Sequence, residues 1–133
     1  MNNNLRTLAQ YRLDRASETL LEAKLLFETG HFNGSVNRLY YAAFYAARAL
    51  LAIKGLDSSK HSGVISLFNK EFVKEGIIDK STGKALTKAF KLRSEGDYQD
   101  FRRFNNAEIE ELVADVSGLI QEALLFINDT SEI

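Results

Sequence analysis

The sequence predicts an all-α protein, an up-and-down bundle of the four-helix type built from about five helices. Proline is absent and glycine occurs only 8 times in 133 residues, so little in the chain interrupts a helix. Apolar residues recur every three to four positions through several long segments, which is the period of one helix face. Each such face needs another to cover it, and short connections favour antiparallel packing.

The first predicted helix runs from about Leu5 to Thr29. Gly30 follows as a C-terminal stop, and a short connection at 31–32 leads into the next helix. The apolar positions expected to face the core are Leu5, Leu8, Leu13, Ala16, Leu20, Ala23 and Phe27.

The second predicted helix extends from about Asn33 to Lys54 and contains the segment NRLYYAAFYAARALL (37–51). An apolar stripe predicts its buried face: Val36, Leu39, Tyr40, Ala43, Phe44, Ala47, Leu50 and Leu51. A polar and aromatic column follows at spacings of four, four and three residues: Asn37, Tyr41, Tyr45 and Arg48. The many alanines permit close approach of a neighbouring helix.

A shorter third helix is expected after a cap at Ser58 or Ser59, and it ends at Gly76. Its apolar side comprises Val64, Ile65, Leu67, Phe68, Phe72 and Val73.

A fourth helix is expected after a cap at Asp79 or Ser81, and it ends before Gly96. Its apolar residues are Ala85, Leu86, Ala89, Phe90 and Leu92. The following segment, GDYQDFRRFNN (96–106), has no clean period and is predicted to be an ordered, irregular loop.

A last helix is expected to reach about Ile127. Asn105 followed three residues later by Glu108 forms a capping-box pattern at its start. The tail NDTSEI (128–133) is expected to fray. A chain of 133 residues is long enough to bury one core, so residues 1–133 are predicted to form a single domain.

Composition excludes several classes of function. Cysteine is absent, which excludes disulfides, thiolate metal sites and cysteine nucleophiles. The two histidines, His31 and His61, are thirty residues apart and lack a patterned carboxylate partner, so we expect no metal site and no cofactor. The start of the chain has no apolar run of the length that a signal peptide or membrane span requires, which predicts a cytoplasmic protein without membrane contact.

Charge is balanced over the chain but unevenly placed. Lys and Arg number 17 against 18 Asp and Glu, so a surface built throughout for phosphate binding is not expected. Basic residues concentrate in one third of the chain: Lys84, Lys88, Lys91, Arg93, Arg102 and Arg103. The three lysines form a solvated helix face or, if they adjoin the arginines, a phosphate track.

Three segments in order resemble the HEPN domain over about residues 8–127. They are NRLYYAAFYAARALL, KHSGVISLF, and LRSEGDY ahead of a long acidic helix, and the resemblance is to the small stand-alone prokaryotic branch. It implies a helical bundle that commonly forms homodimers. Many HEPN proteins are metal-independent ribonucleases, and many form toxin–antitoxin pairs with a small nucleotidyltransferase.

The resemblance also assigns a key position to Arg93. Nuclease members of the family use an Arg followed after four to six residues by a His, shared across two subunits. Here the positions after Arg93 hold Tyr98, Gln99 and Asp100 instead of a histidine. Imidazole transfers protons near neutral pH, whereas phenols and carboxyls titrate far from it.

Candidate site residues follow from the column and from this Arg93 segment. The candidates for ligand binding are Asn37, Tyr41, Tyr45, Arg48, Arg93, Asp97 and Tyr98. The catalytic candidates are Arg93, Tyr98 and Asp100. In this interpretation the arginines hold phosphate and Tyr41 or Tyr45 stacks on a base.

Structural roles are open for the same residues. Arg93 can pair with Asp97 near a helix end. Asn37, Tyr41 and Arg48 can form a buried polar network that fixes the register of two helices.

Other polar residues favour structural interpretations. Tyr40 is expected in the core, and His61 is expected to form a hydrogen bond at the start of a helix rather than to act as a base. Tyr98 can anchor the loop, stack on a base or accept a nucleotidyl group.

Three functions are consistent with these features. The first is a dimeric nucleotide- or RNA-binding module of a toxin–antitoxin or defence-type system that works with a nucleotidyltransferase partner. The second is a metal-independent ribonuclease toxin that uses Arg93 with a non-histidine partner. The third is a purely structural helical interaction domain.

Overall fold

Every regular element of the chain that the structure describes is helical. The computed structural model describes residues 3–130, and no strand occurs among them, which confirms the predicted all-α bundle. The elements are α1 (Asn3–Glu28), α2 (Phe32–Ile53), α3 (His61–Phe68), the π-helical turn η1 (Asn69–Val73), α4 (Lys80–Tyr98) and α5 (Asn106–Thr130).

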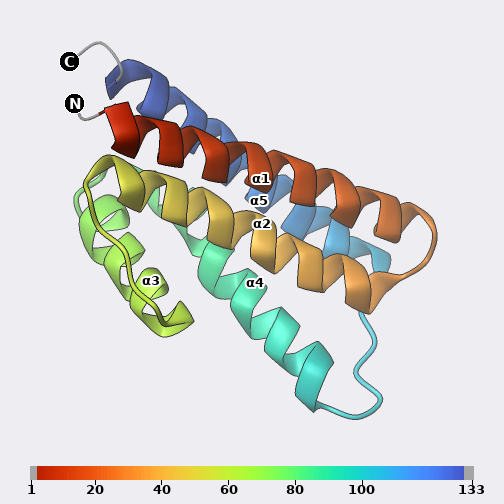
Figure 1. Ribbon diagram of the computed structural model, residues 1–133. Helices are drawn as coiled ribbons and strands as arrows, with labels where there is room; N and C mark the ends of the chain where they lie inside the picture. The colour runs from red at the N-terminus through yellow and green to blue at the C-terminus, as the bar shows by residue number, and fades with distance from the viewer. Residues whose placement is uncertain (1–2, 131–133) are drawn as a thin grey trace.

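Helices α1 and α2 form a closely packed antiparallel hairpin (Figure 1). Gly30, with φ of +80°, closes α1 because its left-handed conformation lets the N–H of His31 donate to the carbonyl of Leu26 at 2.8 Å. Buried alanines recur every seven residues in α1, at Ala9, Ala16 and Ala23, and face the alanine-rich side of α2. Small side chains at this seam let the two backbones approach closely.

The buried face of α1 differs in part from the predicted one. Leu8 was expected inside but is exposed, whereas Ala9, Arg12 and Thr19 are buried. Arg12 can lie at the seam because its guanidinium donates to the carbonyl of Arg48 at 3.1 Å and to Asp57 at 3.1 Å. A search for apolar residues alone misses such a position.

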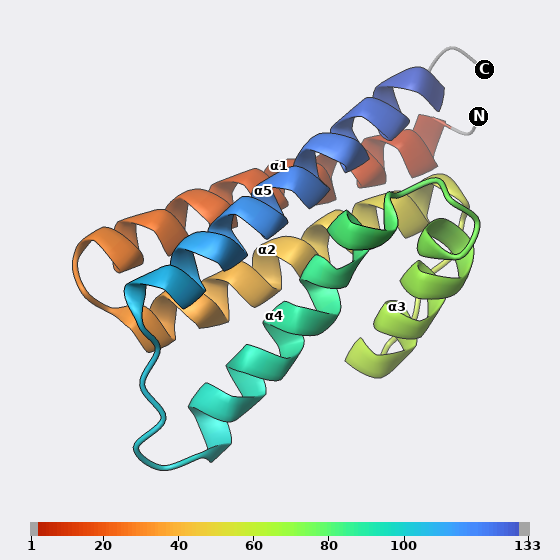
Figure 2. The ribbon, with the colours of Figure 1, turned by 180° about the vertical axis from the view of Figure 1, so that it is seen from behind.

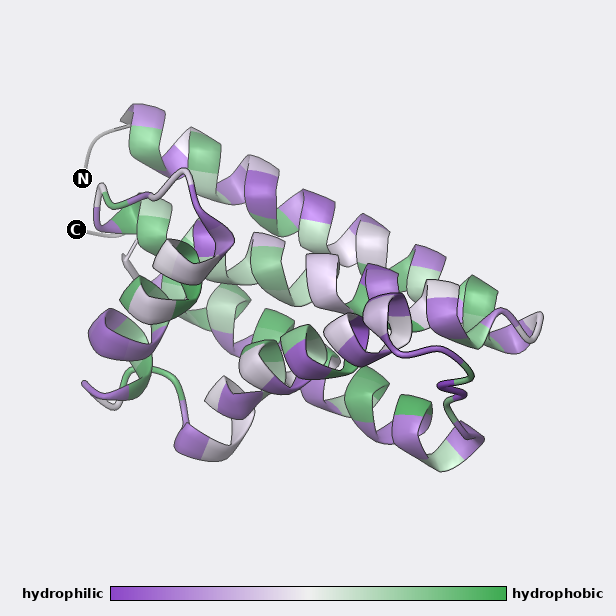
Figure 3. Ribbon diagram, turned by 90° about the horizontal axis from the view of Figure 1, so that it is seen from below, coloured by the Kyte–Doolittle hydropathy of each residue, from purple (hydrophilic) through white to green (hydrophobic). Residues whose placement is uncertain are grey.

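Helix α2 forms the centre of the bundle. It contacts α1, α4 and α5, and α3 packs beside it on the same side as α4 (Figures 1 and 2). All eight residues of its predicted apolar stripe are buried, which confirms that prediction. Hydrophobic and hydrophilic positions alternate along the other helices, as expected for helices with one covered face (Figure 3).

The segment between α2 and α4 contains the short helix α3 and the π-helical turn η1, where the sequence predicted one helix that ends at Gly76. Helix α3 begins after Lys60 without a side-chain cap, and the hydroxyl of Ser58 instead accepts from the N–H of Lys60 at 3.2 Å. The π-helical turn η1 buries Phe72. Asp79 caps α4 by accepting from the N–H of Ser81 at 3.1 Å, as predicted.

Helix α4 is longer than predicted because Gly96 does not end it. The helix continues to Tyr98, and a Cβ at Gly96 would lie 3.0 Å from the ring of Phe104. Glycine therefore provides space for an aromatic ring at this position. The irregular connection before α5 is shorter than predicted, and in it Phe101 adopts a φ of +67°.

The start of α5 is the predicted capping box. The N–H of Glu108 donates to the side chain of Asn105 at 2.8 Å, and the N–H of Asn105 donates back to Glu108 at 3.1 Å. The helix passes Ile127 and ends at Thr130, so residues 128–130 are helical rather than frayed. Residues 131–133 of the predicted tail lie outside the described residues. Among residues 3–130, no helix has the combination of length and apolarity that crossing a bilayer requires.

The burial of Phe44 in the central helix predicts a large loss of stability on truncation. Phe44→Ala should lower the free energy of unfolding by about 3 to 5 kcal/mol, because the ring leaves a cavity in the core. Denaturant unfolding measures this loss. Phe101→Ala is the control, since this ring is 97% exposed and its removal should change little. A loss below about 1 kcal/mol for Phe44→Ala would place the stripe on the wrong face.

Candidate functional site

Arg93 of α4 lies against two tyrosines of α2. Its guanidinium carbon is 5.1 Å from the ring centroid of Tyr40 and 5.4 Å from that of Tyr41. Cations are attracted to the faces of aromatic rings at such distances. The structure thus brings together Arg93 and Tyr41, two of the predicted site residues that are far apart in the sequence.

The side chain of Arg93 makes no hydrogen bond within residues 3–130. Its Nε lies 3.2 Å from Oδ2 of Asp97, but the geometry does not make a hydrogen bond. Among residues 3–130, this Nε is the only buried side-chain nitrogen or oxygen without a hydrogen-bond partner. The side chain as a whole is 22% exposed. Because Nε is buried, an anion that approaches from solvent would meet the outer Nη donors, which make no hydrogen bond within residues 3–130.

A second arginine, Arg38, adds to the positive charge around Tyr41. Its guanidinium carbon lies 5.0 Å from the Tyr41 ring centroid, and Oδ1 of Asn37 accepts from its Nη2 at 2.8 Å. Its ion pair with Glu22 is long, at 3.9 Å. The prediction missed Arg38, although its position three residues before Tyr41 places both on one helix face.

Tyr40 joins the site to α3. The ring is fully buried, and its hydroxyl lies 2.9 Å from Nδ1 of His61. Burial raises the pKa of Tyr40 to about 12, an effect that the nearby charge of Arg93 only partly offsets. The expected core position of Tyr40 and the expected hydrogen bond of His61 are both present. We call Tyr40, Tyr41, His61 and Arg93 the tyrosine–arginine cluster.

Arg48 does not join this cluster. It donates from Nη2 to Asp57 at 2.9 Å, and the same carboxylate accepts from Arg12, so α1, α2 and the segment before α3 are tied together. Burial alone would raise the pKa of Asp57, but hydrogen bonds from Arg48 and the N–H of Ser58, with the arginine charges, hold this pKa below its usual range. The geometry of Arg48 is that of a structural ion-pair network.

Tyr45 leaves the predicted column as well. Its ring lies 5.3 Å from the guanidinium carbon of Arg15 on α1. The column of four residues therefore divides: Asn37 accepts from Arg38, Tyr41 contacts Arg93, Tyr45 contacts Arg15 of α1, and Arg48 binds Asp57.

The remaining candidates follow Arg93 in the sequence. Asp97 pairs with Arg93, whereas no hydrogen bond or ion pair within residues 3–130 joins Tyr98 or Asp100 to Arg93. Tyr98 is 83% exposed at the end of α4.

Two basic residues of the predicted phosphate track, Lys88 and Arg102, are paired with carboxylates. Lys88 binds Glu111 at 2.8 Å and Asp115 at 3.1 Å on α5. Arg102 binds Glu95 at 3.1 Å and Glu108 at 2.8 Å. These charges are neutralised by carboxylates, so they hold α4, the connection and α5 together.

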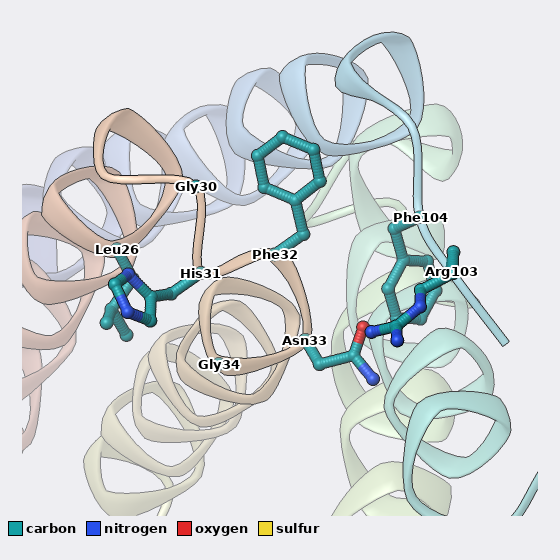
Figure 4. Close-up of a pocket in the computed structure, with 8 residues that line it drawn as sticks. All are labelled: Leu26, Gly30, His31, Phe32, Asn33, Gly34, Arg103 and Phe104. Carbon is teal, nitrogen blue, oxygen red and sulfur yellow. The ribbon is translucent and has the colours of Figure 1, made fainter. Parts of the chain in front are cut away.

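A hollow of about 490 Å³ lies elsewhere, between the α1–α2 turn and the connection before α5 (Figure 4). Its lining residues are Leu26, Gly30, His31, Phe32, Asn33, Gly34, Arg103 and Phe104. None of them is a predicted site residue, and none has a buried polar atom without a partner. We therefore place the candidate site at the tyrosine–arginine cluster.

The histidines are not arranged for metal binding. In the described part of the chain, no group of three or more His, Asp or Glu side chains could hold a metal ion. Nδ1 of His61 faces Tyr40, and Nδ1 of His31 lies 3.0 Å from the hydroxyl of Thr29.

The protein is thus an all-helical bundle in which an arginine lies on two tyrosine rings. Comparison with known proteins gives its family. The model of the HEPN domain matches residues 9–126, so the chain belongs to the HEPN domain family. The chain is 39% identical over 127 residues to a UPF0332 protein of Thermotoga maritima, covering 96% of both chains. It is 37% identical over 128 residues to a protein of Methanocaldococcus jannaschii named "Putative toxin MJ0605", covering 96% of this chain and 90% of that one.

The Asp57 network predicts a pH-dependent loss of stability. Asp57→Asn should lower the free energy of unfolding near neutral pH by about 1 to 3 kcal/mol, because Arg12 loses its charged partner at a buried seam. Because folding lowers the pKa of Asp57, its contribution is present above the usual carboxyl range and is lost as the pH falls below that range through the lowered pKa of the folded state. Denaturant unfolding at several pH values measures the difference.

Asp14→Asn is the control for this experiment, because Asp14 is exposed and only accepts from Gln10 at 2.9 Å. A wild-type advantage over Asp57→Asn that stays constant from neutral to acidic pH would show that the carboxylate charge is not what holds Arg12 and Arg48.

Proposed function

We propose that the protein is an RNA-binding module of a toxin–antitoxin or defence-type system, and that Arg93 is the centre of its phosphate-binding site. The observation that carries this proposal is the state of Arg93, whose guanidinium is held on two tyrosine rings while its donors remain without a proper acceptor. An arginine positioned in advance loses little side-chain entropy when an anion binds.

The surroundings of Arg93 suit a phosphate attached to a base. The side chain of Tyr41, which projects from α2, is half-buried. The guanidinium groups of Arg38 and Arg93 both lie near its ring. Exposed aromatic and guanidinium planes bind unstacked bases, and arginine donors bind the phosphates between them. Within residues 3–130, the ion pairs that oppose this positive charge are that of Arg93 with Asp97, at 3.2 Å, and that of Arg38 with Glu22, at 3.9 Å.

Relatives support the cellular role. Two proteins of Methanocaldococcus jannaschii, 37% and 29% identical to this chain, carry the name "Putative toxin". Since many HEPN proteins pair with a small nucleotidyltransferase, we propose such a partner for this chain. The hydroxyl of Tyr98, at the exposed end of α4, is in reach of a partner enzyme.

Binding of a short fluorescein-labelled single-stranded RNA, followed by fluorescence anisotropy, tests the RNA-binding proposal. Arg93→Ala should weaken binding by about tenfold or more, because hydrogen bonds to charged groups contribute about 1.5 to 3 kcal/mol. The wild-type affinity should fall with added salt, as phosphate contacts require.

Arg15→Ala is the matched control. Arg15 also lies over a tyrosine, Tyr45, and also pairs with a carboxylate on its own helix, Glu18, but within residues 3–130 it has no ion pair or cation–ring contact with the cluster. Equal loss of RNA affinity in Arg93→Ala and Arg15→Ala would overturn the proposed site. If the wild type does not bind RNA, the RNA-binding proposal is wrong and the interpretation as a purely structural interaction domain is favoured. Cleavage of the RNA without metal would instead favour the ribonuclease alternative.

We also propose that the module acts as a homodimer. Large apolar side chains are exposed on the surface, among them Leu21 and Leu25 on one face of α1 and Phe101 before α5. Sedimentation velocity should give the mass of two chains, and a single-chain mass at all protein concentrations would contradict the proposal.

A further inference from the structure

His61 occupies a position beside Arg93 that its place in the sequence does not reveal. It is the first residue of α3, thirty-two residues before Arg93. Its ring lies 5.8 Å from the Tyr40 centroid and 6.0 Å from the Tyr41 centroid. These are the same two rings that support Arg93. The ring of Phe44, at 4.4 Å, packs against the imidazole and helps to fix its orientation.

The hydroxyl of Tyr40 determines which nitrogen of His61 carries a proton. This hydroxyl is buried, and within residues 3–130 its one hydrogen-bond partner is Nδ1 of His61 at 2.9 Å. A buried hydroxyl that donated to nothing would carry a large desolvation penalty. Tyr40 therefore donates and Nδ1 accepts, which leaves the proton of the neutral imidazole on Nε2. The raised pKa of Tyr40 keeps the phenol protonated in this role.

The Nε2–H of His61 has no hydrogen-bond partner among residues 3–130. In the part of the chain that the structure describes, Nε2 makes no hydrogen bond, yet it is not among the buried atoms that lack one. This nitrogen is therefore not fully buried. His61 thus has a hydrogen-bond donor without a partner beside the two tyrosine rings on which Arg93 lies.

We propose that His61 and Arg93 bind one phosphoryl group between them, with Tyr40 as the positioning residue that holds His61 in its Nε2–H form. This inference rests on the proposed function, because Arg93 is the centre of that site. Two donors that point at one oxyanion bind it more tightly than either donor alone. A neutral imidazole whose Nδ1 is occupied is arranged to donate to a phosphate rather than to take a proton from a hydroxyl group.

The tautomer and the contact can be tested directly by ¹⁵N NMR of the histidine ring, with inorganic phosphate as the probe. His31→Gln provides the background, since His31 is the other histidine of the chain and its removal leaves only the signals of His61. We expect the free protein to show the Nε2–H form and phosphate to shift the Nε2 resonance. Arg93→Ala should abolish that shift.

Variants of His61 and Tyr40 separate binding from structure. His61→Ala should weaken binding of the short RNA by about tenfold, whereas His61→Gln, which keeps an N–H donor, should restore most of it. Tyr40→Phe keeps the ring but releases Nδ1, so the NMR spectrum should change to a mixture of tautomers. Circular dichroism of each variant confirms that the helices are intact.

The results distinguish this inference from the proposed function. An Nδ1–H form in the free protein, or an Nε2 resonance that phosphate does not move, would overturn the role of His61. RNA binding that needs Arg93 but is equal in His61→Ala and wild type would overturn it while leaving the proposed function intact. A phosphate-induced shift of Nε2 without RNA binding would support the phosphate site and overturn the RNA-binding proposal.

Discussion

The rest of the site depends on the buried hydroxyl of Tyr40. The ring belongs to the core of α2, so its polar end had to find a partner inside the bundle, and it finds His61 at the start of α3. The face of the same ring supports Arg93 from α4. One side chain thus connects three helices and contacts both the imidazole of His61 and the guanidinium of Arg93. A change of tyrosine to a smaller residue would remove both the core volume and the support for Arg93.

The arginines of this protein divide into structural and available groups by what opposes their charge. Arg12 and Arg48 share Asp57, and Arg102 lies between Glu95 and Glu108. These pairs cross between helices or join a helix to a connection, so they fix the geometry of the bundle. Among residues 3–130, Arg93 forms an ion pair with one carboxylate, that of Asp97, in poor geometry for a hydrogen bond. The candidate site is therefore identified by the N–H donors of Arg93, which lack an acceptor among the described residues, rather than by the number of basic residues.

Much of the fold could be predicted from the sequence, because the signals are local. The apolar stripe of α2, the glycine after α1 and the capping box of α5 follow from helix period and end chemistry. The extension of α4 past Gly96 could not, because the reason is the distant ring of Phe104. Arg93 and Tyr41, which the structure brings into contact, were named from the sequence, whereas the positions of His61 and Arg38 beside the same rings were not. A hydrogen bond between Tyr40 and His61 depends on the packing of α3, which no spacing in the sequence encodes.

A crystal structure of the protein with a short 5′-phosphorylated RNA tests the central claim most directly, since it shows where a phosphate binds without reference to any variant. We expect a phosphate oxygen within about 3 Å of the Arg93 guanidinium, the ordinary length of a charge-assisted hydrogen bond, with the Tyr40 and Tyr41 rings beneath it. A phosphate bound instead in the hollow beside Asn33 and Arg103, with Arg93 still facing only Asp97, would contradict it.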